Sequence, residues 1–150
     1  MASPLSPTDH DTIAGVIFPI LPEHVARFFD CRKRVFVKYV GREALPTKLK
    51  LGSKLFFYQS RSNKCIVGEA RIVDMTIDTA EEVTRKYPDD LFLTAEELED
   101  YVGNRKNKRM LVLVLKDIRK YATPIRLDKG PAMSGRYMTK AALESLRATQ

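Results

Sequence analysis

The chain has 150 residues, of which 44% are hydrophobic and 30% are charged, and this composition predicts a single soluble domain with one core. It contains no run of about 18 apolar residues, and its N-terminus lacks the basic and apolar regions of a signal peptide, so we expect a cytoplasmic protein without a membrane span. Two cysteines without a CxxC motif and two histidines argue against a disulfide framework or a structural metal, and no cofactor is expected.

The formal net charge of +7 favours an anionic partner such as nucleic acid, a nucleotide or phosphate. The charge is unevenly distributed along the chain. Residues 27–50 and 105–120 are strongly basic, whereas residues 81–100 are strongly acidic. We therefore expect one basic and one acidic surface.

The first half of the chain predicts mainly strands. Residues 1–12 are expected to form a flexible tail, and Pro22 fits the first turn of a short helix that follows the first strand. A glycine inside a strand usually marks a bulge or a close backbone approach, which we expect at Gly68. The predicted elements are a strand at 14–20, a helix at 21–30, a strand at 35–40, and a hairpin of strands 54–60 and 65–75.

The second half begins with two predicted helices. Thr79 is a cap signal for a helix over 79–87, and Thr94 with Glu97 forms a capping-box pattern for a helix over 93–103 that ends at Gly103. Further along, we predict a strand at 110–118, a segment 119–127 that extends the sheet or turns across it, a loop at 128–138, and a helix at 139–150.

This order contains too few βαβ units for a doubly wound sheet. It predicts an α+β fold: a small, mostly antiparallel barrel with flanking helices, in one domain over residues 13–150.

The stretch "GVIFPILPEHVARFFDCRKRVFVKY", followed by "LKLGSKLFFYQS" and "CIVGEARI", resembles the PUA-like superfamily, whose members include PUA, ASCH, EVE and YTH domains. The resemblance covers roughly residues 14–127. It is closest to ASCH-like proteins and to an uncharacterised archaeal family of this fold. The resemblance implies a PUA-like pseudobarrel with a cleft that holds RNA or a nucleobase.

Some ASCH proteins are small amidohydrolases that act on N4-acylated cytidines, using a lysine, a threonine and a glutamate. Lys33 matches the lysine position and would be the catalytic residue if this chain were an enzyme. Phe36 stands at the threonine position, and the glutamate position falls near Asp90. These departures leave hydrolysis of an acylated cytidine as the alternative to RNA or nucleobase binding.

Three adjacent cations, Arg32, Lys33 and Arg34, open the predicted strand at 35–40, and Lys38 lies within it. We interpret them as phosphate-binding residues, with Lys33 directed into the cleft between the first helix and the barrel. A solvated strand end is the alternative interpretation, because most charge runs are of that kind.

Two further groups are candidates for RNA contact. Arg105 and Lys106 precede a predicted strand, and they would either line the cleft or keep a strand edge soluble. Lys129, Arg136 and Tyr137 lie in or beside a glycine-rich loop, where Tyr137 is a candidate for base stacking. Glu69 and Arg71 are interpreted as a cross-strand ion pair on the outside of the sheet, with a position facing the cleft as the alternative. The oligomeric state is not indicated.

Overall fold

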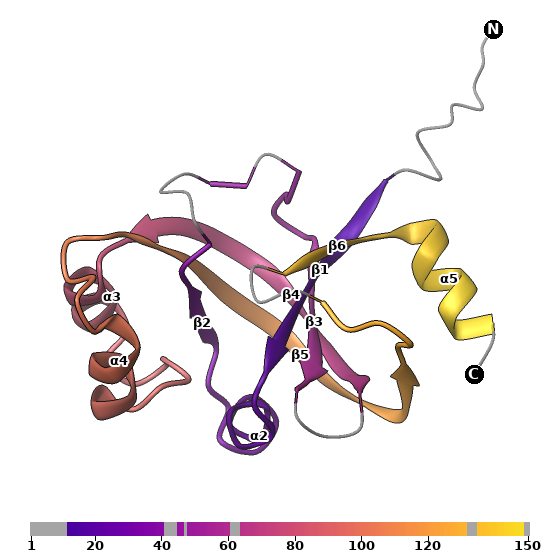
Figure 1. Cartoon of the computed structure of the whole chain (residues 1–150), viewed down its shortest axis with the longest axis horizontal. Helices are drawn as coiled ribbons and strands as arrows, with labels where there is room; N and C mark the ends of the chain where they lie inside the picture. The colour runs from indigo at the N-terminus through magenta and orange to yellow at the C-terminus, as the bar shows by residue number, and fades with distance from the viewer. Residues whose placement is uncertain (1–11, 41–44, 47, 61–63, 132–134, 149–150) are drawn as a thin grey trace, which may run out of the picture.

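The computed structural model describes residues 12–40, 45–46, 48–60, 64–131 and 135–148 (Figure 1). The predicted tail over residues 1–12 lies outside these ranges except for Thr12. The elements are β1 (Ile13–Ile20), α2 (Pro22–Asp30), β2 (Val35–Lys38), β3 (Lys54–Gln59), β4 (Cys65–Asp78), α3 (Ala80–Lys86), α4 (Ala95–Val102), β5 (Met110–Arg126), β6 (Arg136–Thr139) and α5 (Lys140–Ala148). None of the described helices has the length and apolar character needed to cross a membrane.

The strands form one six-stranded sheet in the order β2-β5-β4-β3-β1-β6. β1 and β3 run parallel, and the other neighbouring strands run antiparallel. No pairing joins β2 to β6 among the described residues, so the sheet is bent but open. The predicted α+β class and mostly antiparallel arrangement are confirmed.

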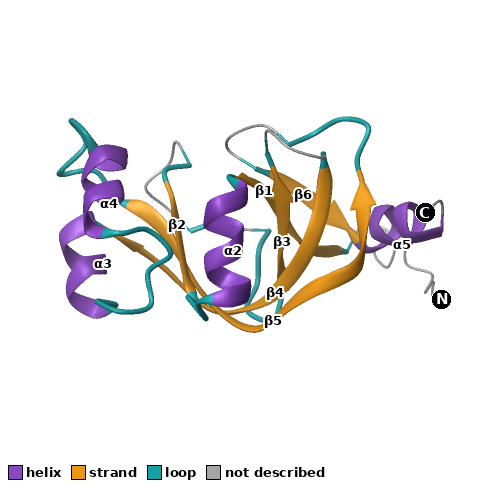
Figure 2. Cartoon of the chain, turned by 90° about the horizontal axis from the view of Figure 1, so that it is seen from below, coloured by secondary structure: helices purple, strands orange, loops and turns teal. Residues whose placement is uncertain are grey.

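The two long strands β4 and β5 give the sheet its curvature, and α2 lies within the curve (Figure 2). Their pairing shifts register at three places, one of them between Ile66 and Gly68. Such bulges bend a strand and increase its twist. A Cβ atom at Gly68 would lie 2.5 Å from both the Arg119 carbonyl oxygen and the Phe29 ring. The predicted bulge and close approach at Gly68 are thus both present.

Each face of the sheet carries its own hydrophobic cluster, because side chains alternate along a strand. On β1, Val16 and Phe18 belong to the larger cluster, which also contains Phe28 of α2, whereas Ile17 belongs to the smaller cluster with Leu143 of α5. The figures show α3 and α4 at one end of the molecule and α5 at the other (Figures 1 and 2). The helices therefore flank the sheet as predicted.

Local sequence signals placed the helix boundaries well. Thr79 and Thr94 each accept a hydrogen bond from the backbone N–H three residues on, and Glu82 and Glu97 complete two capping boxes. Gly103 caps the end of α4 with φ of 52°, which favours glycine. These interactions satisfy N–H groups that the first turn of a helix leaves without partners.

β6 and β2 differ from the sequence expectation, and β5 decides between two alternatives that the sequence left open. The segment 119–126 continues β5 as one strand, which settles the two alternatives left open for it. Residues 136–139 form the strand β6 on the edge of β1, although a loop is predicted there. β2 ends at Lys38, because the backbone N–H of Tyr39 donates instead to the Tyr101 hydroxyl at 2.8 Å.

Candidate functional site

A large cavity lies where the N-terminal end of α2 meets β2, the end of β3, α4 and the segment after β5. Its volume is about 1000 Å³, at the upper limit of the 300–1,000 Å³ or so of typical small-molecule sites. Its lining residues are Pro19, Ile20, Leu21, His24, Phe36, Val37, Lys38, Tyr58, Ser60, Lys64, Phe92, Leu93, Glu97, Asp100, Tyr101, Gly130 and Pro131.

Aromatic rings form much of the cavity wall. Phe36 and Phe92 stack with their ring centroids 5.2 Å apart, and both side chains are almost completely buried. Tyr58 and Tyr101 add rings that carry a hydroxyl group. Phe36 and Phe92 therefore pack beneath the wall, and the half-buried ring of Tyr101 offers the more accessible aromatic surface to a planar ligand.

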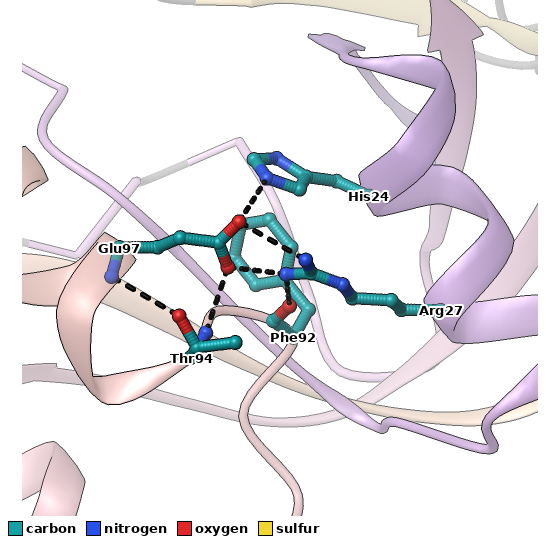
Figure 3. A network of polar contacts seen from close by, with 5 residues as sticks. All are labelled: His24, Arg27, Phe92, Thr94 and Glu97. Carbon is teal, nitrogen blue, oxygen red and sulfur yellow. Dashed lines mark hydrogen bonds and ion pairs between the residues drawn. The ribbon is translucent and has the colours of Figure 1, made fainter.

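An ionic network joins α2 to α4 beside the cavity (Figure 3). The Arg27 guanidinium donates to both carboxylate oxygens of Glu97, the second at 3.0 Å, and to the Phe92 carbonyl oxygen at 2.9 Å. His24 Nε2 lies 3.3 Å from the Glu97 carboxylate, and the Thr94 N–H donates to the same group at 2.8 Å. Glu97 thus completes the N-terminal capping box of α4 and also links α4 to α2.

The hydrogen bond from Arg27 lowers the pKa of Glu97 to about 2, outweighing the opposing effect of burial. Glu97 is therefore an anion at neutral pH. Its side chain is one-third exposed, so this network is a surface feature of the cavity rim and contributes modestly to stability.

Lys38 is the predicted site residue that lines the cavity. Burial lowers the pKa of its ammonium group, and the nearby positive charge of Arg105 lowers it further. Among the described residues, no side chain or backbone group forms a hydrogen bond or ion pair with the Lys38 ammonium group. Asp100, which also lines the cavity, makes no ion pair within the described part of the chain. These two charges are therefore available to a ligand.

Arg105 does not line the cavity but supports its wall. Its guanidinium lies 4.0 Å from the centroid of the Tyr39 ring and 5.1 Å from that of Tyr101, and it donates to the Tyr101 carbonyl oxygen. The rings of Tyr39 and Tyr101 are themselves 5.1 Å apart. Arg105 consequently holds Tyr101 in place and contributes positive potential near Lys38.

Another part of the cavity wall forms where the end of β3 and the segment after β5 approach each other closely. A Cβ atom at Gly130 would lie 2.7 Å from the Tyr58 hydroxyl, so a side chain there would collide with a lining residue. The glycine-rich segment singled out in the sequence therefore contributes to the cavity through Gly130 and Pro131.

The three adjacent cations lie away from this cavity. They follow the C-terminal end of α2, whereas the cavity is lined by Leu21 and His24 at the other end, about 12 Å away along the helix axis. Lys33 Nζ donates to the Asp89 carbonyl oxygen at 2.7 Å, and Arg34 pairs with Asp90 at 3.4 Å. Arg32 is exposed and has a φ of 56°.

The remaining predicted residues are also outside the lining. Lys106 is exposed on the segment after α4, and Lys129 is exposed beside Gly130. Arg136 donates to the Lys129 carbonyl oxygen at 3.1 Å. Tyr137 is 38% exposed on β6, with the Lys48 ammonium 5.8 Å from its ring centroid. Of the nine candidate cations and aromatics, the structure thus brings Lys38 to the cavity and Arg105 to its support.

Sequence reasoning missed the polar residues of the cavity that lie on helices. No sequence motif for ligand binding includes these residues, which are His24, Glu97, Asp100 and Tyr101. The capping box with Thr94 already accounts for a glutamate at position 97, so the sequence gives no reason to assign it a second role. The signal that marks them is spatial, since Glu97 and Arg27 are 70 residues apart. Among the described residues, no group of three or more His, Cys, Asp or Glu side chains is arranged to hold a metal ion.

Comparison with solved structures places this fold among ASCH proteins. The ASCH protein from Zymomonas mobilis matches with a TM-score of 0.74 and 19% identity, covering 90% of this chain and 94% of that chain. A singly substituted form of the same protein matches with a TM-score of 0.75 and 18% identity, covering 90% and 97%. A hypothetical protein from Leishmania major matches with a TM-score of 0.53 and 12% identity, covering 93% and 96%. The predicted PUA-like, ASCH-like fold is confirmed.

Sequence comparison finds an uncharacterised protein from the archaeon Methanocaldococcus jannaschii that is 30% identical over 103 residues, which cover 62% of this chain and 95% of that protein. This relative agrees with the archaeal family that the sequence resembles. A protein family also matches residues 13–140, almost the whole described structure. The chain therefore belongs to the family described as "Domain of unknown function (DUF365)".

Proposed function

We propose that the protein binds RNA or a nucleoside, with one nucleobase held in the cavity between α2, β2 and α4. The ASCH-like fold is associated with RNA binding in general, and the cavity supplies the chemistry that a base requires. The observation that carries the proposal is the half-buried Lys38, whose ammonium group has no partner among the described residues and which lies in a wall of aromatic rings.

The polar groups of the cavity suit a base better than a phosphate. Lys38 and Lys64 are opposed by Glu97 and Asp100, so the lining has no excess of positive charge. Lys38 would donate to a ring carbonyl or ring nitrogen, and Asp100 would accept from an exocyclic amino group. The ring of Tyr101 would contact the flat face of the base, and the buried Phe36 and Phe92 would form the apolar floor of the pocket.

Phosphate groups of a bound RNA would then lie outside the cavity, where the half-buried Lys33 and the exposed cations Arg32, Arg34, Lys106, Lys129 and Arg136 are candidates for backbone contact. Contacts of this type add affinity that falls with salt and carry no base preference. Lys33→Ala is expected to weaken RNA binding at low salt while leaving the binding of a free nucleoside unchanged.

Calorimetric titration with the four ribonucleosides tests the base pocket directly. Lys38→Met keeps the alkyl chain and removes the charge, and it is expected to weaken nucleoside binding at least tenfold, since hydrogen bonds from charged groups contribute about 1.5–3 kcal/mol. Arg85→Gln on α3 removes one positive charge from an exposed position away from the cavity and serves as the matched control. Equal nucleoside affinity in the parent and Lys38→Met would contradict the proposal.

Hydrolysis of an acylated cytidine remains a second candidate, and the environment of Lys38 favours it. An amine whose pKa is lowered by burial is better suited to act as a base or nucleophile than an ordinary lysine. Incubation with N4-acetylcytidine, monitored for release of acetate, tests this activity. Activity that survives Lys33→Ala and disappears in Lys38→Met would assign the role to Lys38, and no acetate release from the parent would remove this candidate.

A further inference from the structure

A second hollow lies between the outer part of β5 and α5, at the opposite end of the molecule from α3 and α4 (Figure 1). Its volume is about 470 Å³, and we call it the β5–α5 hollow. Its lining contains three cations and a tyrosine but no acidic residue: Arg119, Lys120, Tyr121, Ala122, Thr123, Ile125 and Arg147. It shares no lining residue with the cavity described above.

Beneath the hollow, one buried carboxylate organises the cations. Glu69 is 7% exposed, which corrects its expected position on the outside of the sheet. Arg119 and Arg147 reach the same Glu69 oxygen, Oε1, at 3.4 and 3.3 Å, and the Tyr121 hydroxyl donates to it at 2.6 Å. Lys54 pairs with the other oxygen at 2.5 Å. Both guanidinium groups are thereby held at the same carboxylate oxygen.

Glu69 stays ionised in this position. Burial by itself raises its pKa, but the hydrogen bonds from Lys54 and Tyr121 outweigh burial and hold the pKa below its usual range. The carboxylate balances only one of the three cations that pair with it, Lys54, Arg119 and Arg147, and Lys120 adds a further positive charge to the lining of the hollow. A surplus of positive charge therefore remains at the surface of the hollow.

The cations of the hollow keep most of their hydrogen-bonding capacity. The side chains of Arg119 and Arg147 are 63% and 44% exposed, and each guanidinium has five N–H donors, of which Glu69 and Tyr121 engage few. Lys120 has no ion pair among the described residues. The guanidinium groups lie 5.5 and 5.9 Å from the centroid of the Tyr121 ring, which limits their freedom further.

We propose that the β5–α5 hollow binds the phosphodiester backbone of RNA, independently of the cavity that holds the base. Two guanidinium groups held at one carboxylate oxygen offer their remaining N–H donors to the oxygens of a phosphate, and Lys120 and the Thr123 hydroxyl add donors to the same lining. The choice of RNA as the partner rests on the proposed function, whereas the phosphate chemistry rests on the hollow alone.

A probe without bases separates this surface from the cavity. The probe is a fluorescent oligomer of about ten ribose phosphates lacking bases, and its anisotropy is measured against the full chain at several salt concentrations. Each phosphate contact on a single strand contributes about 0.7 to the slope of log K against log salt. The double variant Arg119→Gln/Lys120→Gln should therefore reduce the slope by about 1.4.

Lys120→Gln alone provides a test that does not risk the fold, because this side chain has no polar partner among the described residues. It should reduce the slope by about 0.7, whereas the control Arg85→Gln on α3 should leave it unchanged. Slopes equal to that of the parent in both hollow variants would overturn the proposal. Equal displacement of the probe by polyglutamate of the same charge would also overturn it, because the hollow would then select negative charge alone.

The two proposals fail in different ways. Nucleoside binding should be lost in Lys38→Met and kept in Arg119→Gln/Lys120→Gln, with the reverse pattern for the baseless probe. If no nucleoside binds but the slope still depends on Lys120, the base pocket is wrong and the backbone surface stands. If nucleosides bind and the slope is unaffected by both hollow variants, the backbone surface is wrong and the base pocket stands.

Discussion

The two hollows are built around carboxylates that are used in opposite ways. At the cavity, Glu97 is one-third exposed and shares its charge with Arg27, His24 and its own helix cap. At the β5–α5 hollow, Glu69 is nearly buried and pairs with three cations. The first carboxylate locks two helices around a charge-balanced pocket, and the second fixes a group of cations that it cannot neutralise.

This difference explains why charge clustering along the chain did not lead to the cavity. The cations at residues 32–34 are adjacent in sequence, but two of them already have partners at the surface. Lys33 donates to the Asp89 carbonyl oxygen, and Arg34 pairs with Asp90. The surplus charge of the hollow comes instead from strands β3 and β5 and from α5, which the sheet brings together. Net charge indicates that an anionic partner is favoured, whereas the fold determines where that charge is left unpaired.

The largest expected effect comes from a position that supports both regions. At Gly68, an added Cβ atom meets the Phe29 ring of α2 on one side and the Arg119 backbone on the other. Gly68→Ala should therefore lower the free energy of unfolding by about 2–3 kcal/mol, the usual cost of forcing extra volume into a packed interior. Urea denaturation measures this change. Ala122→Val, at an exposed position on β5, adds carbon atoms in open space and should change the stability by less than about 0.5 kcal/mol.

Replacing Glu69 and Glu97 in turn tests whether the more buried carboxylate contributes more to the free energy of unfolding. Glu69→Gln should lower the free energy of unfolding by about 2 kcal/mol, because charge-assisted hydrogen bonds from Lys54 and Tyr121 are lost in a buried setting. Glu97→Gln should cost about 1 kcal/mol, since its network is partly screened by solvent. Glu144→Gln, exposed on α5, is the control for removing one negative charge. Equal costs for Glu69 and Glu97 would contradict the distinction drawn between the two regions.

Features set by neighbours in sequence were predicted correctly. The caps at Thr79 and Thr94 follow from side chains three residues apart, and the bulge at Gly68 follows from a glycine in an otherwise β-branched strand. The hairpin of β3 and β4 follows from two strand-forming segments separated by a short polar turn in the sequence. In each case the physical cause lies within a few positions of the chain.

Features set by distant segments were not predicted. β6 has only Met138 as a buried residue, so four residues of weak pattern become a strand because the edge of β1 is free to pair with them. Lys38 rather than Lys33 reaches the cavity because strand β2 carries it there, whereas Lys33 lies on the turn before that strand. A run of like charges has no hydrophobic periodicity, so the sequence does not indicate which of these lysine side chains points toward the cavity.

Acid should weaken the cavity network through Glu97. Because its folded pKa of about 2 lies below its usual value of 4.5, Glu97 contributes stability above about pH 4.5, and this contribution is lost as the pH falls toward 2. Between about pH 6 and pH 3, the parent should lose about 1 kcal/mol more than Glu97→Gln, after allowance for solvent screening. Thermal unfolding of both proteins across this range provides the measurement. Parallel pH profiles would show that Arg27 does not hold the carboxylate in solution.

The smallest expected effect concerns an exposed ion pair next to the β5–α5 hollow. Arg71 Nε lies 2.9 Å from Asp117 Oδ2, with 47% and 64% of the two side chains exposed, so the pair adds at most about 0.5 kcal/mol to stability. Arg71 does not line the hollow, and its charge is matched by Asp117. Arg71→Gln should therefore leave both the urea midpoint and the salt slope for the baseless probe unchanged. A slope reduced as much as in Lys120→Gln would mean that the phosphate-binding surface continues along β4. It would also mean that pairing with the exposed Asp117 does not prevent Arg71 from contacting phosphate.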